Sequence, residues 1–356
     1  MKQPYFETPP KITVSITATC NLDCETCYAD CNRRPKRKEL TTQEWLAFIE
    51  YLVENGFIQI YFEGGEPLHR PDFDTLLQSC CRRMMTLVRT HGTLIDRARA
   101  RKLKRLGVGR LFVDLMGASA GVHDAAARTP GSFARSCAGV RNAVEAGLPT
   151  DVVLILTRHN VDELQAYLEL AHALGAQRAG ILRLYPLGRA RHRWSELALS
   201  LEEQEEALAA VRPPPGLAVM RSWHPNDANC CWQAAAVDPF GRSIGCMYLR
   251  EYVDFGDVRE TPFLETWHGN ALYKALRAGT VESSCEHCES NEGTRGGCRS
   301  TAYAFTGRWT APDPFCSHSN GGIDLRVLPK RLLRGDAEPE APPDPGDGSV
   351  RGVHAR

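Results

Sequence analysis

The sequence predicts an α/β protein in which helices lie outside a parallel sheet, followed by a small cysteine-rich region. From residue 12 to about 186, strand-like and helix-like segments alternate, and the six βα-type repeats imply a parallel sheet. Beyond the prolines at 213–215 the cysteines become dense. Six units are too few to close an eight-stranded barrel.

Local patterns predict the elements in order. Residues 12–17 alternate and are rich in β-branched side chains, which is typical of a strand. Thr41 and Glu44 form a capping box at the start of a helix with one apolar face. Further strands are expected at 57–62, 85–90, 111–115, 152–157 and 181–185, and helices near 72–82, 94–106, 132–146 and 161–174. Asn160 and Glu163 are expected to cap the last of these helices, and a Glu-rich helix follows at 201–211.

Composition excludes several classes of function. Lys plus Arg and Asp plus Glu both number 43, so a formal charge of zero argues against nucleic acid or an anionic membrane as the main partner. No apolar run approaches the roughly 18 residues of a membrane span, and the N-terminus lacks a signal sequence. Fourteen cysteines without such a signal indicate metal or redox ligands in a reducing cytosol. We therefore expect a cytoplasmic metalloenzyme.

The most informative motif is a cysteine triplet after the first predicted strand. Cys20, Cys24 and Cys27 have the spacing Cys-x3-Cys-x2-Cys. Three thiolates can hold three irons of a [4Fe–4S] cluster and leave the fourth iron open for a small chelating cofactor. A zinc site without its fourth ligand, or three unrelated thiols, are the alternatives.

A second motif follows the strand expected at 57–62. It consists of Gly64, Gly65, Glu66 and Pro67. Together with the cysteine triplet, it resembles the signature of radical S-adenosylmethionine (radical SAM) enzymes, in which this loop contacts the amino group of the methionine moiety. Paired glycines let backbone approach a ligand, and Glu66 is expected to oppose an ammonium group.

This resemblance implies an open partial (β/α)6 TIM-type barrel with its chemistry at the carboxyl ends of the strands, where both motifs fall. It also implies two cofactors, a SAM-binding [4Fe–4S] cluster and S-adenosylmethionine, and an electron donor such as flavodoxin or ferredoxin.

The later cysteines resemble the SPASM extension of radical SAM enzymes, a small domain that holds auxiliary clusters. The resemblance implies one or two auxiliary [4Fe–4S] clusters, although Thr294 stands where the pattern has a further cysteine. A structural zinc ribbon is the alternative. The ligands implied are Cys231, Cys246, Cys285, Cys288, Cys298 and Cys316.

Five other residues are candidates for the site. His91, Asn160 and Arg183 occupy positions where relatives contact the cofactor, and Arg183 would bind the methionine carboxylate. Asp114 and His91 are candidate general bases. Cys230 is a candidate hydrogen-atom donor.

The chain divides into four predicted parts. The radical SAM partial barrel covers residues 1–200, a helical linker 201–225, and the SPASM-like domain 226–325. Residues 326–356 are rich in Pro, Gly and acidic residues and are expected to be disordered.

The resemblance implies hydrogen-atom abstraction by a 5′-deoxyadenosyl radical. Only about 11 residues precede the first strand, which leaves no room for a peptide-recognition domain. The main hypothesis is therefore a small-molecule substrate, with dehydrogenation or epimerisation of a carbinol on a sugar or aminocyclitol in natural-product biosynthesis. The alternative is maturation of a ribosomally made peptide by a thioether, a carbon–carbon crosslink or side-chain oxidation. An electron carrier or zinc scaffold is a third, non-enzymatic class.

Overall fold

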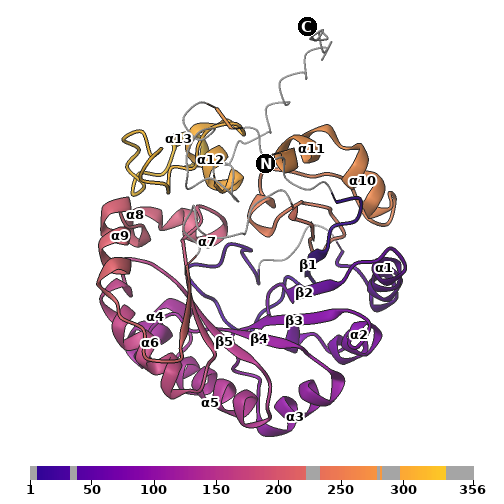
Figure 1. Ribbon diagram of the computed structural model, residues 1–356, viewed down its shortest axis with the longest axis horizontal. Coiled ribbons are helices and arrows are strands. Elements are labelled where there is room, and N and C mark those ends of the chain that lie inside the picture. The colour runs from indigo at the N-terminus through magenta and orange to yellow at the C-terminus, as the bar shows by residue number, and fades with distance from the viewer. Residues whose placement is uncertain (1–5, 33–37, 222–232, 279–280, 283–296, 334–356) are drawn as a thin grey trace, which may run out of the picture.

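The computed structural model describes residues 6–32, 38–221, 233–278, 281–282 and 297–333. Its centre is a sheet of eight parallel strands in the order β7-β6-β5-β4-β3-β2-β1-β8. The sheet curves into an arc with helices on its outer side (Figure 1). In the described residues the two end strands, β7 and β8, do not pair with each other, so the barrel is open, as the sequence predicts.

The strands are short and lie side by side in chain order. Each strand from β1 to β7 pairs with its neighbour in parallel register. Their bounds are β1 Lys11–Ser15, β2 Gln59–Glu63, β3 Met85–Thr90, β4 Arg110–Asp114, β5 Thr150–Ile155, β6 Arg178–Leu182, β7 Ala218–Arg221 and β8 Ala236–Val237.

The α-helices of the barrel alternate with these strands, and four more follow β8. Short 3₁₀ turns lie at Pro67–His69, Val161–Glu163 and Met247–Leu249. The α-helices are α1 Thr42–Glu54, α2 Phe73–Cys80, α3 Arg97–Leu106, α4 Ala120–Ala127, α5 Ser132–Glu145, α6 Leu164–Ala173, α7 Gly188–His192, α8 Trp194–Leu197, α9 Leu201–Ala210, α10 Phe263–Gly269, α11 Ala271–Ala278, α12 Arg299–Thr306 and α13 Lys330–Leu333.

Helix α1 shows how local sequence builds the outer layer. The Thr41 side chain accepts a hydrogen bond from the Glu44 backbone, and the Glu44 carboxylate accepts one from Thr41, which confirms the predicted capping box. Trp45, Ile49 and Leu52 lie on one helical face and are fully buried. That face packs against the sheet and so fixes the strand ends that carry the site.

Two expectations about the sheet need correction. The structure has eight strands instead of six, because β7 is a short, partly exposed edge strand and β8 has only two residues, so neither shows a periodic pattern. The predicted ends of the fifth and sixth strands were too late. Leu156 and Leu184 are buried but lie beyond the last residues assigned to β5 and β6, so the apolar pattern runs past the ends of both strands.

The predicted caps at Asn160 and Glu163 are also wrong. Neither side chain caps the turn or helix that it precedes. Asn160 bonds the Thr157 amide and the carbonyls of Met116 and Ile155. The Glu163 carboxylate accepts bonds from the loop before α4.

Segments after residue 233 lie across the open side of the arc (Figure 1). Strand β8 pairs with β1, and the Leu264 amide of α10 donates to the Tyr51 hydroxyl of α1 at 3.0 Å. The Trp194 indole donates to the Leu325 carbonyl at 2.7 Å. These contacts tie the late segments to β1 and α1 on one side of the opening and to α8 on the other. The domain bounds expected from the sequence stay a prediction.

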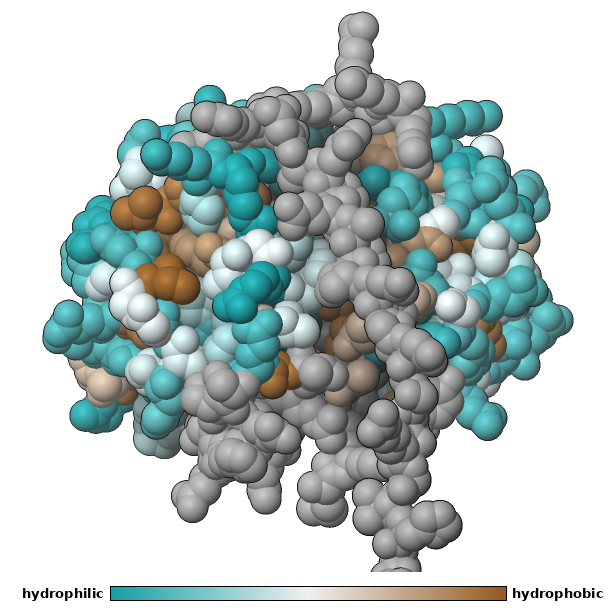
Figure 2. Space-filling view, turned by 90° about the horizontal axis from the view of Figure 1, so that it is seen from above, coloured by the Kyte–Doolittle hydropathy of each residue, from teal (hydrophilic) through white to brown (hydrophobic). Residues whose placement is uncertain are grey.

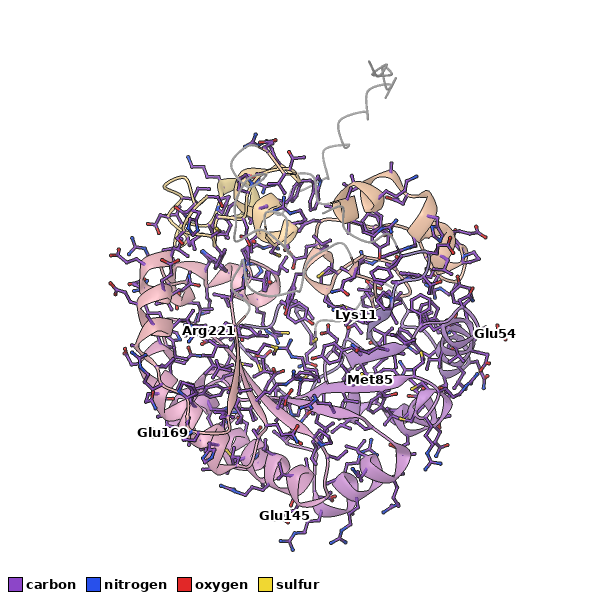
Figure 3. The ribbon with its side chains drawn as sticks, viewed as in Figure 1. Lys11, Glu54, Met85, Glu145, Glu169 and Arg221 are labelled. Carbon is purple, nitrogen blue, oxygen red and sulfur yellow. The ribbon has the colours of Figure 1, made fainter. Side chains whose placement is uncertain are left out.

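Side chains fill the interior of the arc, and sulfur, nitrogen and oxygen atoms are among them (Figure 3). On the face seen in Figure 2, apolar side chains of the described residues form separate patches among hydrophilic ones. None of the helices in the described part of the chain combines the length and apolar character needed to cross a bilayer.

Candidate active site

The site is a cavity at the carboxyl ends of β1 to β5, and it encloses about 760 Å³, part of which is open to solvent. Cys20, Cys24 and Cys27 all line it, so the structure brings the triplet together. The other lining residues are Leu22, Thr26, Tyr28, Ala29, Cys31, Glu63, Gly64, Gly65, Arg89, Thr90, His91, Asp114, Met116, His123, Ala127, Ile155 and Arg189.

Two side chains hold the cysteine loop by hydrogen bonds to its backbone groups. The Asn32 side chain accepts a hydrogen bond from the Cys20 amide at 2.7 Å. Arg189 donates to the Cys24 carbonyl at 2.8 Å and to the Cys31 carbonyl at 2.6 Å. Arg189 thus fixes the loop through its carbonyls and leaves the thiols free to face the cavity.

The three thiols differ electrostatically. Burial raises the pKa of Cys20 to about 12 and raises that of Cys24 well above its usual range. A hydrogen bond from Cys31 lowers the pKa of Cys27 to about 6. Because buried thiolates need positive charge nearby, iron is a suitable replacement for their protons.

The paired glycines of the second motif touch backbone directly. A Cβ on Gly65 would lie 2.1 Å from the Thr19 carbonyl oxygen, and one on Gly64 would lie 2.6 Å from that of Thr17. The Gly65 amide donates to the Thr17 carbonyl at 2.7 Å. Only glycine allows this loop to pack against the cysteine loop while both line the cavity.

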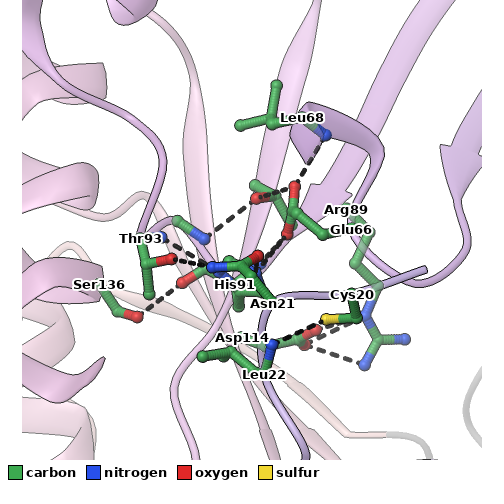
Figure 4. Close-up of polar contacts among 12 residues, drawn as sticks. Cys20, Asn21, Leu22, Glu66, Leu68, Arg89, His91, Thr93, Asp114 and Ser136 are labelled. Atoms are coloured by element: carbon green, nitrogen blue, oxygen red, sulfur yellow. Dashed lines mark hydrogen bonds and ion pairs between the residues drawn. The ribbon is translucent and has the colours of Figure 1, made fainter. Parts of the chain in front are cut away.

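Glu66 holds this loop in place and does not line the cavity. It is fully buried, and its carboxylate accepts hydrogen bonds from the Leu68 amide, the Thr90 hydroxyl and the His91 amide (Figure 4). The predicted contact of Glu66 with an ammonium group stays a prediction. Pro67 begins a 3₁₀ turn behind it and is also buried.

His91 lines the cavity and joins the two motif loops (Figure 4). Its Nδ1 accepts from the Thr93 amide at 3.1 Å, so Nε2 carries the proton. That Nε2 lies 2.8 Å from the Asn21 side-chain oxygen and 3.0 Å from Glu66 Oε2. His91 therefore positions the loop and has no free nitrogen to act as a base.

Asp114 lines the cavity but is paired with Arg89. The Arg89 Nε lies 3.1 and 3.2 Å from the two carboxylate oxygens, and Nη2 lies 2.9 Å from Oδ1 (Figure 4). Both carboxylate oxygens of Asp114 therefore already accept charge-assisted hydrogen bonds. Its predicted role as a general base stays a prediction.

Sequence reasoning missed a buried carboxyl group, Glu63, at the last position of β2. Its Oε1 accepts a hydrogen bond from the Tyr28 hydroxyl and lies 3.9 Å from an Arg250 nitrogen. Burial raises the pKa of Glu63. Its place directly before Gly64, at the end of a strand that faces the cavity, is a signal that could have identified it.

Beyond Tyr28 lies a smaller cavity of about 240 Å³. Tyr28, Thr26 and Ile155 line both cavities. Tyr185 and Tyr248 stack in its wall with ring centroids 3.8 Å apart, and burial raises the pKa of Tyr248 to about 12.

Arg183 faces this second cavity and not the cysteine triplet. Its guanidinium donates to Asp313 at 2.6 Å, and the same Asp313 oxygen accepts from the Cys298 amide at 2.9 Å. Asn160 is buried behind the cavity wall and ties β5 to the loop after β4. Neither residue lines the first cavity, so their predicted cofactor contacts are not supported.

The auxiliary cysteines are only partly described. Cys246, Cys298 and Cys316 lie in segments around the open side of the barrel, while Cys230, Cys231, Cys285 and Cys288 fall outside the described residues. Cys298 precedes α12, directly beside the Arg183–Asp313 pair. Their predicted roles as ligands therefore remain predictions.

Comparison with known proteins decides the family. The radical SAM superfamily matches residues 14–171, and the SPASM iron–sulfur cluster-binding domain matches residues 230–289. The PqqA peptide cyclase of Gluconobacter oxydans is 30% identical over 87% of this chain and 91% of its own length. This chain belongs to the radical SAM superfamily. It has a SPASM domain and, with it, auxiliary iron–sulfur clusters.

Other relatives of this radical SAM protein carry different names. The AdoMet-dependent heme synthase of Methanosarcina barkeri is 29% identical over 88% of this chain and 97% of its own length. The mycofactocin maturase MftC of Mycolicibacterium smegmatis is 28% identical over 91% of this chain and 88% of its own length. Streptococcus suis SuiB bound to S-adenosylmethionine shares the fold, with a TM-score of 0.70 at 15% identity over 88% of this chain and 78% of SuiB.

The cavity of this radical SAM protein fits its cofactors, a [4Fe–4S] cluster and S-adenosylmethionine. Three thiols line it, and the Gly64–Gly65 backbone forms a close wall that a Cβ would fill. Two buried polar atoms beside it, Thr26 Oγ1 and His123 Nε2, have no hydrogen-bond partner in the described residues. No three described His, Cys, Asp or Glu side chains converge on one point, as ligands of a single ion would, whereas cluster cysteines each bind a different iron.

Proposed function

We propose that this radical SAM enzyme modifies a side chain of a peptide, by forming a crosslink or by oxidation. The observation that carries the proposal is that relatives matching most of the chain are named as a PqqA peptide cyclase and a mycofactocin maturase. These names favour the peptide alternative over the sugar or aminocyclitol carbinol.

The opening of the cavity is compatible with a peptide. Part of the cavity is open to solvent. A peptide that stays outside could therefore present one reacting side chain to the cofactor. The tyrosines of the adjoining smaller cavity offer an apolar wall with polar ends for such a side chain.

Residues of this chain would hold the cofactors and position the loops around them. When bound, the cluster and S-adenosylmethionine supply a 5′-deoxyadenosyl radical that takes a hydrogen atom from the substrate. Cys20, Cys24 and Cys27 would hold three irons of the cluster. Glu66 and His91 keep the two motif loops in register.

An oxidative outcome also needs a proton acceptor, because the substrate loses a hydrogen atom, then an electron to an auxiliary cluster and a proton. Among the acidic and histidine side chains that line the cavity, Asp114 is paired with Arg89, and both His91 nitrogens have hydrogen-bond partners. The Nδ1 of His123 accepts from the Met116 amide, so the other ring nitrogen carries the proton. Glu63 Oε2 accepts no hydrogen bond from any described residue. We assign the proton to this oxygen, since a raised pKa makes the Glu63 carboxylate a stronger base.

The test uses the whole enzyme, reconstituted without oxygen and supplied with S-adenosylmethionine, reduced flavodoxin and the peptide encoded by a small reading frame beside the gene. The expected result is 5′-deoxyadenosine in step with a peptide that has lost the mass of two hydrogen atoms. An unchanged peptide, with turnover of an aminocyclitol or a porphyrin instead, would overturn the proposal.

A further inference from the structure

His123 is a buried histidine that none of the roles described above uses. It lies in α4 with 1% of its surface exposed, and it lines the cavity of the cysteine triplet. Its Nδ1 accepts a hydrogen bond from the Met116 amide at 3.1 Å. An imidazole nitrogen that accepts from an amide carries no proton, so in the neutral ring the proton lies on Nε2.

This Nε2–H group has no hydrogen-bond partner in the described residues, although it is fully buried. An unpaired buried donor is destabilising, so proteins rarely leave one without a reason. The neighbouring ring of Phe133, 5.6 Å away between centroids, offers no acceptor for it. The Asp124 carboxylate is taken by the Gly131 and Phe133 amides. The missing acceptor therefore belongs to a molecule that enters the cavity.

We propose that His123 Nε2 donates a hydrogen bond to an oxygen atom of S-adenosylmethionine, either a ribose hydroxyl or the carboxylate. The cavity that His123 lines is the one that contains the three cysteines and the Gly64–Gly65 backbone, which the cofactor must touch. The smaller cavity beyond Tyr28 does not include His123. This inference stands independently of the peptide substrate.

A neutral ring suits this ligand. Burial lowers the pKa of His123 to about 4, with smaller opposing and reinforcing effects from Asp124 and His91. At neutral pH the side chain therefore offers a donor without a positive charge, and it does not repel the sulfonium and ammonium groups of the cofactor. The His123 side chain should consequently contribute no titration of cofactor affinity between about pH 6 and 8.

Two substitutions separate the proposed contact from a structural role. The amide oxygen of Asn sits near the position of Nδ1, so His123→Asn keeps an acceptor for Met116 and removes the donor toward the cavity. The amide nitrogen of Gln reaches the position of Nε2, so His123→Gln keeps the donor and loses the Met116 bond. Both variants are to be reconstituted and checked for wild-type iron content and circular dichroism.

The measurement is the dissociation constant of S-adenosylmethionine by anaerobic equilibrium dialysis. Loss of one hydrogen bond predicts roughly tenfold weaker binding for His123→Asn and nearly wild-type binding for His123→Gln. Wild-type affinity in the Asn variant, or a loss confined to the Gln variant, would show that His123 only supports the Met116 loop and would overturn the inference.

Cofactor analogues identify the oxygen. Decarboxylated, 2′-deoxy and 3′-deoxy S-adenosylmethionine each lack one acceptor. The analogue that lacks the contacted oxygen should bind wild type and His123→Asn equally well, while the other two should retain the tenfold difference. If all three analogues keep the tenfold difference in affinity between wild type and His123→Asn, the inference is contradicted, because the contact could then be to neither the ribose nor the carboxylate.

Discussion

Glu63 is the residue on which an oxidative reaction depends most directly. In Glu63→Gln the amide cannot take a proton, so 5′-deoxyadenosine should still form while modified product falls by about a hundredfold or more. Product formation in the wild type should also fall as the pH drops through the raised pKa of Glu63, because the protonated acid accepts no further proton. Both species are measured by liquid chromatography with mass spectrometry.

Asp114→Asn is the matched comparison for Glu63, since Asp114 also lines the cavity. If Asp114→Asn loses product selectively and Glu63→Gln does not, the proton belongs to Asp114 and the assignment to Glu63 is wrong.

Gly65 tests the contact between the two motif loops. In Gly65→Ala the new Cβ would lie 2.1 Å from the Thr19 carbonyl oxygen, so the cysteine loop has to move. We expect a loss of about four irons per chain after reconstitution, with weaker binding of S-adenosylmethionine. Gly121→Ala in α4 meets nothing within 4 Å and is the control, expected to bind iron normally. Normal iron content in Gly65→Ala would contradict this close packing.

At the scale of elements, one buried carboxylate joins the end of β6 to the segment that carries Cys298. Asp313 accepts hydrogen bonds from Arg183, the Cys298 amide and the Thr301 hydroxyl, at 2.6, 2.9 and 2.7 Å. Asp313→Asn breaks this buried ion pair, which costs roughly 3–5 kcal/mol. We expect iron to be lost from the auxiliary region, whereas the cluster of the triplet stays.

Iron per chain and the electron paramagnetic resonance spectrum of the reduced protein distinguish the auxiliary clusters from the cluster of the triplet. An Asp313→Asn variant that keeps every auxiliary iron and the wild-type melting temperature would show that this connection is dispensable.

The elements that sequence patterns predicted best are those with a long periodic face or a cap, such as α1. The strand at Met85–Thr90 was predicted to the residue, since β3 is bounded by polar turns. Helix α4, which carries His123, was missed, because its small residues and Gly121 give no apolar stripe. Edge strand β7 was missed for the same physical reason, the lack of a buried face.

For the whole molecule, the sequence revealed those parts of the site that are local motifs and missed those that are contacts between distant segments. The cysteine triplet and the Gly64–Gly65 pair are local in sequence, and each was recognisable without the fold. The contact of Tyr28, Glu63 and Arg250 joins three distant segments, so only the folded chain brings it together. The pairing of Arg183 with Asp313 also joins distant segments and was not foreseen, while the predicted cofactor contact of Arg183 stays a prediction.

The central claim is that one chain holds a radical-generating cluster at the triplet and auxiliary clusters beyond it. Iron and acid-labile sulfide per chain, compared between wild type and a variant with Cys20, Cys24 and Cys27 all replaced by Ala, test it most directly. We predict about twelve irons in the wild type, about eight in the variant, and no 5′-deoxyadenosine from the variant. Equal iron in the two proteins, or about four irons with zinc in the wild type, would contradict the claim.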